Sequence, residues 1–193
     1  MDHLIFHNII TDAEQSKIID YAESRKNNMD SYFKYSPGYL NTLPVGLIPL
    51  NNEEEHPDFI KDIIKRIRYL LGVSNKNYRT WSGWGISYGF IGSGVVNHRD
   101  PVNKDSGPND ILIRMNTIVQ NTDKGGNFVF HYTNHDKIIN VPEKSLLVFP
   151  ASVIDHSVSK NRSNKVRLNF SIDTIVDKSF WENLVIKYQT QCN

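Results

Sequence analysis

The second half of the chain is divided into short segments rich in β-branched and aromatic residues, separated by clusters of glycine, asparagine, aspartate and proline. Such segments are typical of strands, and the clusters between them are typical of turns. From Arg79 onward we expect strands over 80–90, 111–120, 127–132, 137–141, 145–149, 153–158 and 165–175. So many short strands predict a β-sandwich or a jelly roll, which constrains the fold more than any other feature of the chain.

The last of these segments, 165–175, has the clearest alternation of apolar and polar residues. Successive side chains of a strand point to opposite faces, so one face of this strand is apolar and the other is polar. The apolar face carries Val166, Leu168, Phe170 and Ile172, and the polar face carries Arg167, Asn169, Ser171 and Asp173. We therefore expect the polar face to look into a wet cavity or into solvent.

Helices are expected before the strands begin. Thr11 and Glu14 form a capping-box pattern at the start of a helix over 12–26. A second helix is predicted over 57–71, where isoleucine and leucine recur at spacings of three and four residues. Gly72 follows this pattern as a stop signal. Both helices are interpreted as structural support rather than as parts of a site.

The length of the chain, 193 residues, suits one domain. With 39% hydrophobic residues, the chain has enough apolar material for a packed core. We expect a single domain over 1–193, with helical support over 12–71, a jelly-roll core over about 79–175 and a short C-terminal helix over 178–189.

Residues 30–52 are rich in tyrosine, but glycine and proline interrupt the segment, so we expect a loop with short strands. A loop of this length inside a compact domain is often functional. Two interpretations stay open: the segment is a mobile lid over a site, or it is a hairpin that packs against the sheet.

The charge balance and the cysteine content exclude several classes of protein. Lysine and arginine number 22 against 21 acidic residues, and a net charge of +1 lacks the positive field of a DNA coat protein and disfavours a nucleic-acid partner. Cys192 is the single cysteine, which excludes an intramolecular disulfide and a cysteine-based metal site, and fits a reducing, cytoplasmic setting. The sequence shows no secretory signal pattern and no long apolar run, so we expect no membrane partner.

Three residues have the types and spacing of a metal site. His98 and Asp100 are two positions apart, so both side chains lie on the same side if the segment is extended. His156 follows an apolar run further along the chain. Two histidines and one carboxylate form the facial triad of non-haem Fe(II) oxygenases, which leaves positions open for O₂ and a cosubstrate. Taken alone, the His-x-Asp pattern also fits a surface turn in which Asp100 is a cap.

Arg167 lies 11 residues after His156, on the polar face of an otherwise apolar strand. A keto-acid cosubstrate that chelates a metal needs a cation for its distal carboxylate, and a guanidinium binds a carboxylate through two N–H groups. We favour this role for Arg167 over a salt bridge with Asp173. Arg162 is the rival cation, but the segment 159–164 is typical of an exposed turn.

Five parts of the sequence between about Trp84 and Asp173 match one pattern. They are YGFIG (88–92) leading to NHRD (97–100), RMNTIV (114–119), GGNFVF (125–130), SLLVFP (145–150) leading to DHSV (155–158), and KVRLNFS (165–171). In this order they resemble the Fe(II)- and 2-oxoglutarate-dependent dioxygenases, specifically the branch related to prolyl 4-hydroxylases. The family often has a tyrosine three residues before the first histidine, where this chain has Val95.

The resemblance implies a double-stranded β-helix, a cupin-like jelly roll of mainly β structure with flanking helices. It implies that His98, Asp100 and His156 are the catalytic residues and ligate Fe(II), and that 2-oxoglutarate chelates this iron. Arg167 would bind the far carboxylate of 2-oxoglutarate. Tyr88 and Asn169 are further candidates for the cosubstrate pocket, although ordinary strand packing would also explain Tyr88.

The implied reaction oxidises a substrate C–H bond with O₂ while 2-oxoglutarate becomes succinate and CO₂, with ascorbate as an optional reductant. The implied substrate is an amino acid, a peptidyl residue or another small molecule, which the enzyme hydroxylates. Two alternatives stay open: a jelly-roll module that binds a metal or a small molecule without catalysis, and a dioxygenase that oxidises nucleobases. Succinate formation in the absence of substrate would separate an enzyme from a binding module.

Four more residues fit either a site or ordinary structure. Arg114 and Asn116 project from one face of their strand and could bind a substrate carboxylate or amide, but a structural ion pair explains Arg114 equally well. His131 and His135, with an aspartate beside them, could form a second metal cluster, although their position in a turn favours a solvated hairpin tip.

Overall fold

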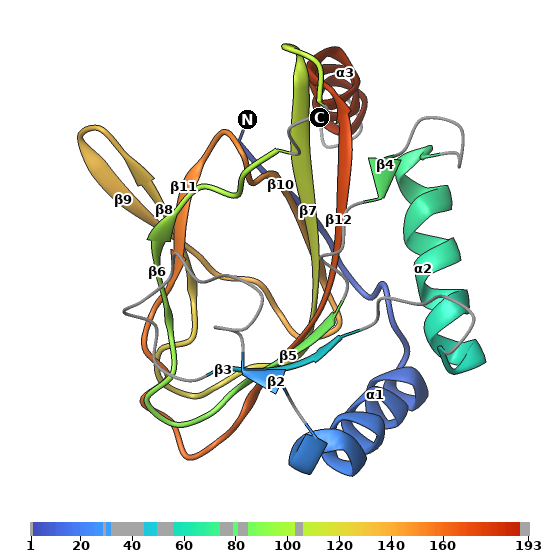
Figure 1. Ribbon diagram of the computed structural model, residues 1–193, viewed down its shortest axis with the longest axis vertical. Helices are drawn as coiled ribbons and strands as arrows, with labels where there is room; N and C mark the ends of the chain where they lie inside the picture. The colour runs from blue at the N-terminus through green and yellow to red at the C-terminus, as the bar shows by residue number, and fades with distance from the viewer. Residues whose placement is uncertain are drawn as a thin grey trace.

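Two antiparallel β-sheets face each other and form the body of the molecule (Figure 1). A computed structural model describes residues 2–28, 30–31, 45–49, 56–73, 79–80, 85–102 and 106–189. The larger sheet contains, in order, β1 (Leu4–Phe6), β10 (Leu146–Pro150), β7 (Asp110–Gln120), β12 (Arg167–Asp177), β5 (Gly85–Gly89), β3 (Val45–Pro49) and β2 (Asp30–Ser31), and β4 (Arg79–Thr80) also pairs with β12. The smaller sheet contains β6 (Val95–His98), β11 (Asp155–Val158), β8 (Phe128–Tyr132) and β9 (His135–Ile139). This double-sheet arrangement confirms the expected jelly roll.

The strands follow the turn signals of the sequence, with ends that differ by a few residues. The segments expected over 111–120 and 165–175 are β7 and β12, each 11 residues long. The segment expected over 80–90 contains β4 and β5, and the residues between these two strands lie outside the described part. The sequence did not predict β1, because an edge strand of 3 residues is too short to show an alternating pattern.

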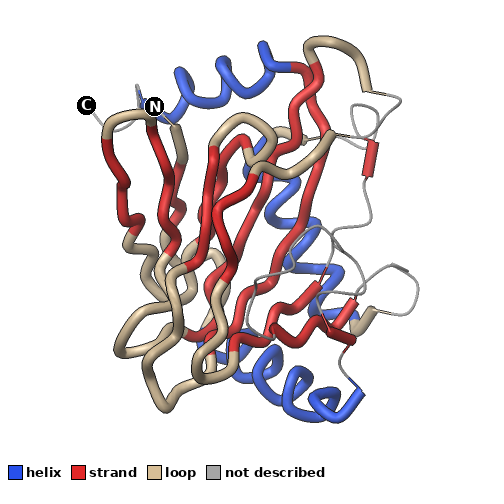
Figure 2. Tube along the Cα trace, turned by 60° about the vertical axis from the view of Figure 1, so that its left-hand side comes forward, coloured by secondary structure: helices blue, strands red, loops and turns tan. Residues whose placement is uncertain are grey.

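Helices α1 (Asp12–Arg25), α2 (Asp58–Leu71) and α3 (Lys178–Gln189) pack against the larger sheet on the face that points away from the smaller one (Figures 1 and 2). A short 3₁₀ helix, η1 (Lys26–Asn28), continues α1. The capping box of Thr11 and Glu14 starts α1, and Gly72, with a φ of 70°, ends α2. Isoleucines of α2 join side chains of β7 and β12 in one hydrophobic core. No helix in the described ranges has the length and hydropathy needed to cross a membrane.

A second hydrophobic core lies between the two sheets, where Phe149 of β10 packs against Phe128 and Phe130 of β8. The polar face of β12 points into the same space. Arg167 lies over the ring of Phe128, and Asp173 is 1% exposed. The polar side chains of this strand are therefore enclosed by the protein rather than turned toward bulk solvent.

The loops at one end of the sheets pack closely together (Figure 2). The double glycine makes this possible, because Gly125 and Gly126 have φ values of 74° and 71°. The N–H of Gly126 donates to the carbonyl of Ser159. A Cβ at Gly126 would lie 3.0 Å from Cδ of Arg167, so the absence of a side chain lets this turn approach the arginine.

Short strands occur in the segment 30–52, as expected. β2 pairs with β3, and β3 continues the larger sheet beside β5. The rest of that segment, which we expect to be either a lid or a packed hairpin, lies outside the described residues.

Gly125→Ala should destabilise the protein more than Gly72→Ala. Both glycines have a positive φ, so alanine costs about 1–2 kcal/mol of backbone strain at either position. A Cβ at Gly125 would also lie 1.9 Å from the carbonyl oxygen of Lys160, whereas a Cβ at Gly72 meets no atom within 4 Å. In urea denaturation we expect Gly125→Ala to lose at least about 2 kcal/mol more than Gly72→Ala. Equal losses would contradict the packing of this turn.

Candidate metal centre

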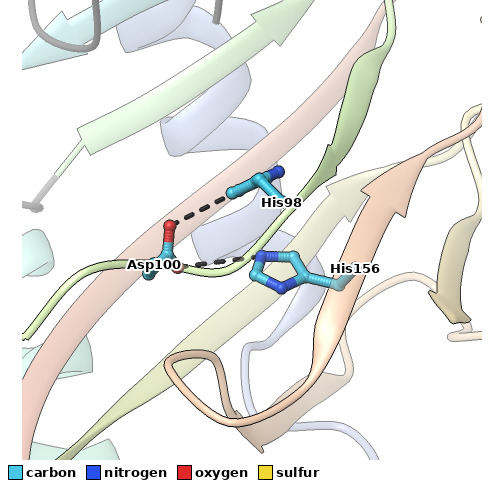
Figure 3. Close-up of side chains that lie close together, drawn as sticks. All are labelled: His98, Asp100 and His156. Atoms are coloured by element: carbon cyan, nitrogen blue, oxygen red, sulfur yellow. Dashed lines mark ion pairs between the residues drawn. The ribbon is translucent and has the colours of Figure 1, made fainter. Parts of the chain in front are cut away.

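The smaller sheet places the two candidate histidines opposite each other. His98 ends β6, and His156 lies in β11, the neighbouring antiparallel strand. The two residues are directly paired in the register of these strands, and the centres of their rings are 4.3 Å apart. Residues 58 positions apart in the sequence therefore meet because β6 and β11 are adjacent (Figure 3).

Both imidazoles are oriented by a backbone carbonyl two residues earlier in the chain. Nδ1 of His98 lies 2.8 Å from the carbonyl of Val96, and Nδ1 of His156 lies 2.9 Å from the carbonyl of Ile154. A carbonyl only accepts, so each Nδ1 carries the proton and donates it. This tautomer leaves the lone pair on Nε2, which is the arrangement found in metal-ligating histidines.

Asp100 completes the group from the loop that follows β6. Its N–H donates to the carbonyl of Ala151 over 3.0 Å, which fixes the main chain at this point. Oδ1 lies 3.4 Å from Nε2 of His98, and Oδ2 lies 3.7 Å from Nε2 of His156. One ligand atom from each of the three residues lies within 4.8 Å of the others, with the side chains converging as Figure 3 shows.

The protonation states of these residues suit metal binding. Burial alone would raise the pKa of Asp100, but the positive charge of Arg114 opposes this effect, and the pKa is lowered to about 2. Burial and, to a smaller extent, the neighbouring His98 lower the pKa of His156 to about 4. At neutral pH the carboxylate is therefore ionised and His156 is neutral, as ligation requires.

The donor set fits one divalent metal. Two imidazoles and one carboxylate form the 2-His-1-carboxylate triad that is typical of non-haem Fe(II). Nε2 of His156 is buried and makes no hydrogen bond within the described part of the chain. A buried acceptor without a partner is costly, and a metal ion would satisfy it.

Arg114 forms the structural ion pair that is the alternative to its expected contact with a substrate. Its guanidinium donates to both carboxylate oxygens of Asp173, at 2.9 and 2.7 Å, and Nη1 lies 3.0 Å from Oδ2 of Asp100. The alternative salt bridge between Asp173 and Arg167 is therefore wrong. Asn116 is 2% exposed and accepts a hydrogen bond from the hydroxyl of Ser171, and its role toward a substrate stays a prediction.

Arg167 is a buried cation without a carboxylate partner among the described residues. It is 7% exposed, and burial lowers the pKa of its guanidinium to about 9. The guanidinium lies 4.7 Å from the ring centre of Phe128, and its Nε makes no hydrogen bond with described residues. Oδ1 of Asn169, two residues further along the same face, is also buried without such a bond. Arg162, the rival cation, is exposed.

The distance between Arg167 and the histidines follows from the smaller sheet. His156 pairs with Phe130, and Phe128 is two residues further along the same face of β8. Two residues of a strand span roughly 7 Å, so Phe128, which lies under the guanidinium, is displaced by about that distance along β8 from the residue that pairs with His156. No local sequence pattern indicates Phe128 as the residue under Arg167, because that contact joins two strands from different sheets.

The structure contradicts the prediction that Tyr88 contacts the cosubstrate. Tyr88 faces the helices, is 4% exposed in the core that they form, and donates its hydroxyl proton to Glu23 of α1. The alternation of β5 decides this, because the residues on either side of Tyr88 occupy the opposite face. Strand packing, the other interpretation of Tyr88, is therefore correct.

The second histidine pair does not form a metal cluster in the described part of the chain. His131 hydrogen-bonds with the carboxylate of Asp136 and the hydroxyl of Ser157, both at 2.8 Å. His135 stacks on Tyr132 at the tip of the β8–β9 hairpin. The contacts of His131 lie on the face of the smaller sheet opposite Phe128 and Phe130, and His135 is exposed, as expected for a solvated hairpin.

Comparison with solved structures supports the fold, whereas comparison of sequences does not. No protein-family model and no curated protein matches the chain. A prolyl hydroxylase from Trichoplax adhaerens, solved with a peptide fragment of the hypoxia inducible factor oxygen degradation domain, is 12% identical, with a TM-score of 0.67 over 93% of this chain and 85% of that one. The non-heme alpha ketoglutarate dependent epimerase SnoN from nogalamycin biosynthesis is 10% identical, with a TM-score of 0.63 over 91% and 78% of the two chains.

A third similar structure contains bound ligands. HygX from Streptomyces hygroscopicus, solved with nickel and 2-oxoglutarate, is 11% identical, with a TM-score of 0.64 over 90% of this chain and 82% of that one. The chain therefore has the fold of the iron- and 2-oxoglutarate-dependent oxygenases, prolyl hydroxylases among them, which confirms the fold that the sequence motifs imply.

Asp100→Ala and His156→Ala should each abolish tight binding of Mn(II) while the fold persists, because each removes one of three ligands. The loss of the free Mn(II) signal in electron paramagnetic resonance measures binding, and circular dichroism checks the fold. His131→Ala is the matched control, since this histidine bonds to Asp136 and Ser157 outside the triad. Unchanged Mn(II) affinity in both ligand variants would rule out the site.

Proposed function

We propose that this protein is an Fe(II)- and 2-oxoglutarate-dependent oxygenase. His98, Asp100 and His156 would hold the iron, and Arg167 would bind the far carboxylate of 2-oxoglutarate. The fold and the converging triad support this proposal. The main support for the proposal is the balance of positive and negative charges on the side chains that lie between the two sheets.

Two arginines and two aspartates contribute charge to this space within the described part of the chain. Arg114 and Arg167 each carry one positive charge, and Asp100 and Asp173 each carry one negative charge. Burial raises the pKa of Asp173, but the charge of Arg114 and the two N–H groups that its guanidinium donates to the carboxylate favour the ionised form. These four charges cancel, so a divalent metal would leave an excess of two positive charges. A dicarboxylate such as 2-oxoglutarate, with two negative charges, restores neutrality.

The position of Arg167 suits the same ligand. Its guanidinium has no carboxylate partner among the described residues, and burying an unpaired cation is costly unless a ligand compensates it. Phe128, the residue under the guanidinium, is displaced by one two-residue strand repeat along β8 from the residue that pairs with His156, and such a repeat is comparable with the length of a five-carbon diacid. Asn169 lies on the same face of β12 and offers an amide for a further hydrogen bond.

The chain would bind, orient and shield the reactants. The Nδ1–H groups of His98 and His156 donate to backbone carbonyls, which would keep both Nε2 atoms directed at the metal. The ring of Phe149 packs edge-on against His156 at 4.9 Å and keeps water from that side. When bound, iron and 2-oxoglutarate supply the oxidising chemistry, in which O₂ is consumed, succinate and CO₂ form and a substrate C–H bond is oxidised.

We propose hydroxylation as the outcome, with an amino acid, a peptidyl residue or another small molecule as the substrate. The Trichoplax prolyl hydroxylase, solved with a peptide, supports the peptidyl form of this proposal. SnoN, an epimerase of the same fold, shows that the fold also serves other outcomes. A screen of amino acids, peptides and oligonucleotides with Fe(II), ascorbate and 2-oxoglutarate tests the substrate, and mass spectrometry identifies an added oxygen atom. No succinate above the level of the Asp100→Ala variant, with or without substrates, would favour a binding module instead.

Arg167→Met should raise the Michaelis constant for 2-oxoglutarate roughly ten- to a hundredfold, because a charge-assisted pair worth on the order of 1.5–3 kcal/mol is lost. The same variant should raise the melting temperature of the ligand-free protein, because burial lowers the pKa of Arg167 and its charge therefore opposes folding. Succinate formation and thermal denaturation measure the two effects.

Arg162→Met is the control, since Arg162 is exposed and should affect neither quantity. A larger Michaelis constant in Arg162→Met than in Arg167→Met would transfer the role to Arg162.

A further inference from the structure

Arg114 lies between two carboxylates that come from different parts of the chain. Its Nε and Nη2 donate to Oδ1 and Oδ2 of Asp173, and its Nη1 lies 3.0 Å from Oδ2 of Asp100. Asp173 is the residue directly opposite Arg114 in the pairing of β7 with β12. The guanidinium is thus fixed by the centre of the larger sheet and reaches across to the candidate metal ligand.

Asp100 depends on such a contact for its orientation. It follows the end of β6, and its main chain is held by the hydrogen bond to the carbonyl of Ala151. The side chain of Asp100 is 6% exposed, so water does not set its direction. A carboxylate with one oxygen engaged by a guanidinium presents its other oxygen to a metal. For Asp100 this other oxygen is Oδ1, which lies 3.4 Å from Nε2 of His98.

We propose that Arg114, clamped by Asp173, is a positioning residue that sets the orientation of Asp100 as a metal ligand. This inference rests on the metal-binding role proposed above for the triad. It replaces the expected role of Arg114 in substrate binding with one directed at the metal centre.

Removing Arg114 has opposite expected effects on metal affinity, depending on whether Arg114 acts through its charge or by positioning Asp100. A guanidinium 3.0 Å from a ligand oxygen repels a divalent metal, so its charge alone weakens metal binding. Removal of Arg114 would then tighten binding if charge were its only effect. If Arg114 positions Asp100, removal weakens binding. The sign of the change therefore separates the two explanations.

The main test is the double variant Arg114→Gln/Asp173→Asn. It removes one positive and one negative charge together, so the net charge near the metal is unchanged. The two amides remain opposite each other in the strand pair and can hydrogen-bond, so neither Arg114 nor Asp173 leaves an unpaired charge behind. We expect the dissociation constant for Mn(II) alone to rise roughly ten- to a hundredfold. Arg99→Gln is the matched control, because Arg99 forms the same two-bond pair with Asp155 on the exposed surface, and it should bind Mn(II) as the wild type does.

Arg114→Lys is the second variant, and it decides the question if the double variant does not fold. Lysine keeps the positive charge but cannot hold two carboxylates in fixed geometry. Under the positioning proposal its Mn(II) affinity falls, whereas an effect of charge alone leaves the affinity at the wild-type value. The visible absorption spectrum of bound Co(II) gives an independent readout, since a reoriented Asp100 changes the ligand geometry at saturation.

The proposal is supported if Mn(II) affinity falls and the Co(II) spectrum changes in the variants at Arg114 but not in Arg99→Gln. Wild-type affinity with an unchanged spectrum would overturn it, as would tighter binding in either variant at Arg114. A fall in affinity with an unchanged Co(II) spectrum would also overturn it, because Asp100 would then keep its orientation. If the wild type itself binds no more Mn(II) than Asp100→Ala does, the proposed function fails, which is a different result.

Discussion

The antiparallel pairing of β7 with β12 is the contact on which the rest of the structure depends. Each strand is 11 residues long, and both lie at the centre of the larger sheet. Alternate side chains on one face join the core formed with the helices. The opposite face directs Arg114, Asp173 and Arg167 into the space between the sheets. One strand pair therefore both stabilises the domain and supplies its buried charges.

Buried charges carry an energetic cost in this domain. Desolvation lowers the pKa of Arg167, which means that the fold holds a cation in an environment that disfavours it. Such a residue opposes stability in the free protein, and a bound carboxylate would reverse this effect. The buried charge of Arg114 needs no ligand for compensation, because it forms ion pairs with two carboxylates of the protein itself.

Local sequence patterns predicted much of the fold and the residues of the triad. The residues that each side chain contacts could be identified only from the three-dimensional structure. The helices follow from caps and periodicity, and His98, Asp100 and His156 from their residue types and order. Tyr88 was misassigned because alternation shows that a strand has two faces without showing which face meets the helices. The partner of Arg114 depends on the register between two strands separated by more than 40 residues, which no local pattern encodes.

In the proposed function, a metal on the triad and the guanidinium of Arg167 bind the two ends of one chelating ligand. A crystal structure of the protein prepared without oxygen in the presence of Mn(II) and 2-oxoglutarate tests this most directly. We expect Mn(II) on Nε2 of His98, Nε2 of His156 and one oxygen of Asp100, with the far carboxylate of 2-oxoglutarate on the guanidinium of Arg167. Mn(II) on other residues, or 2-oxoglutarate bound away from Arg167, would contradict it.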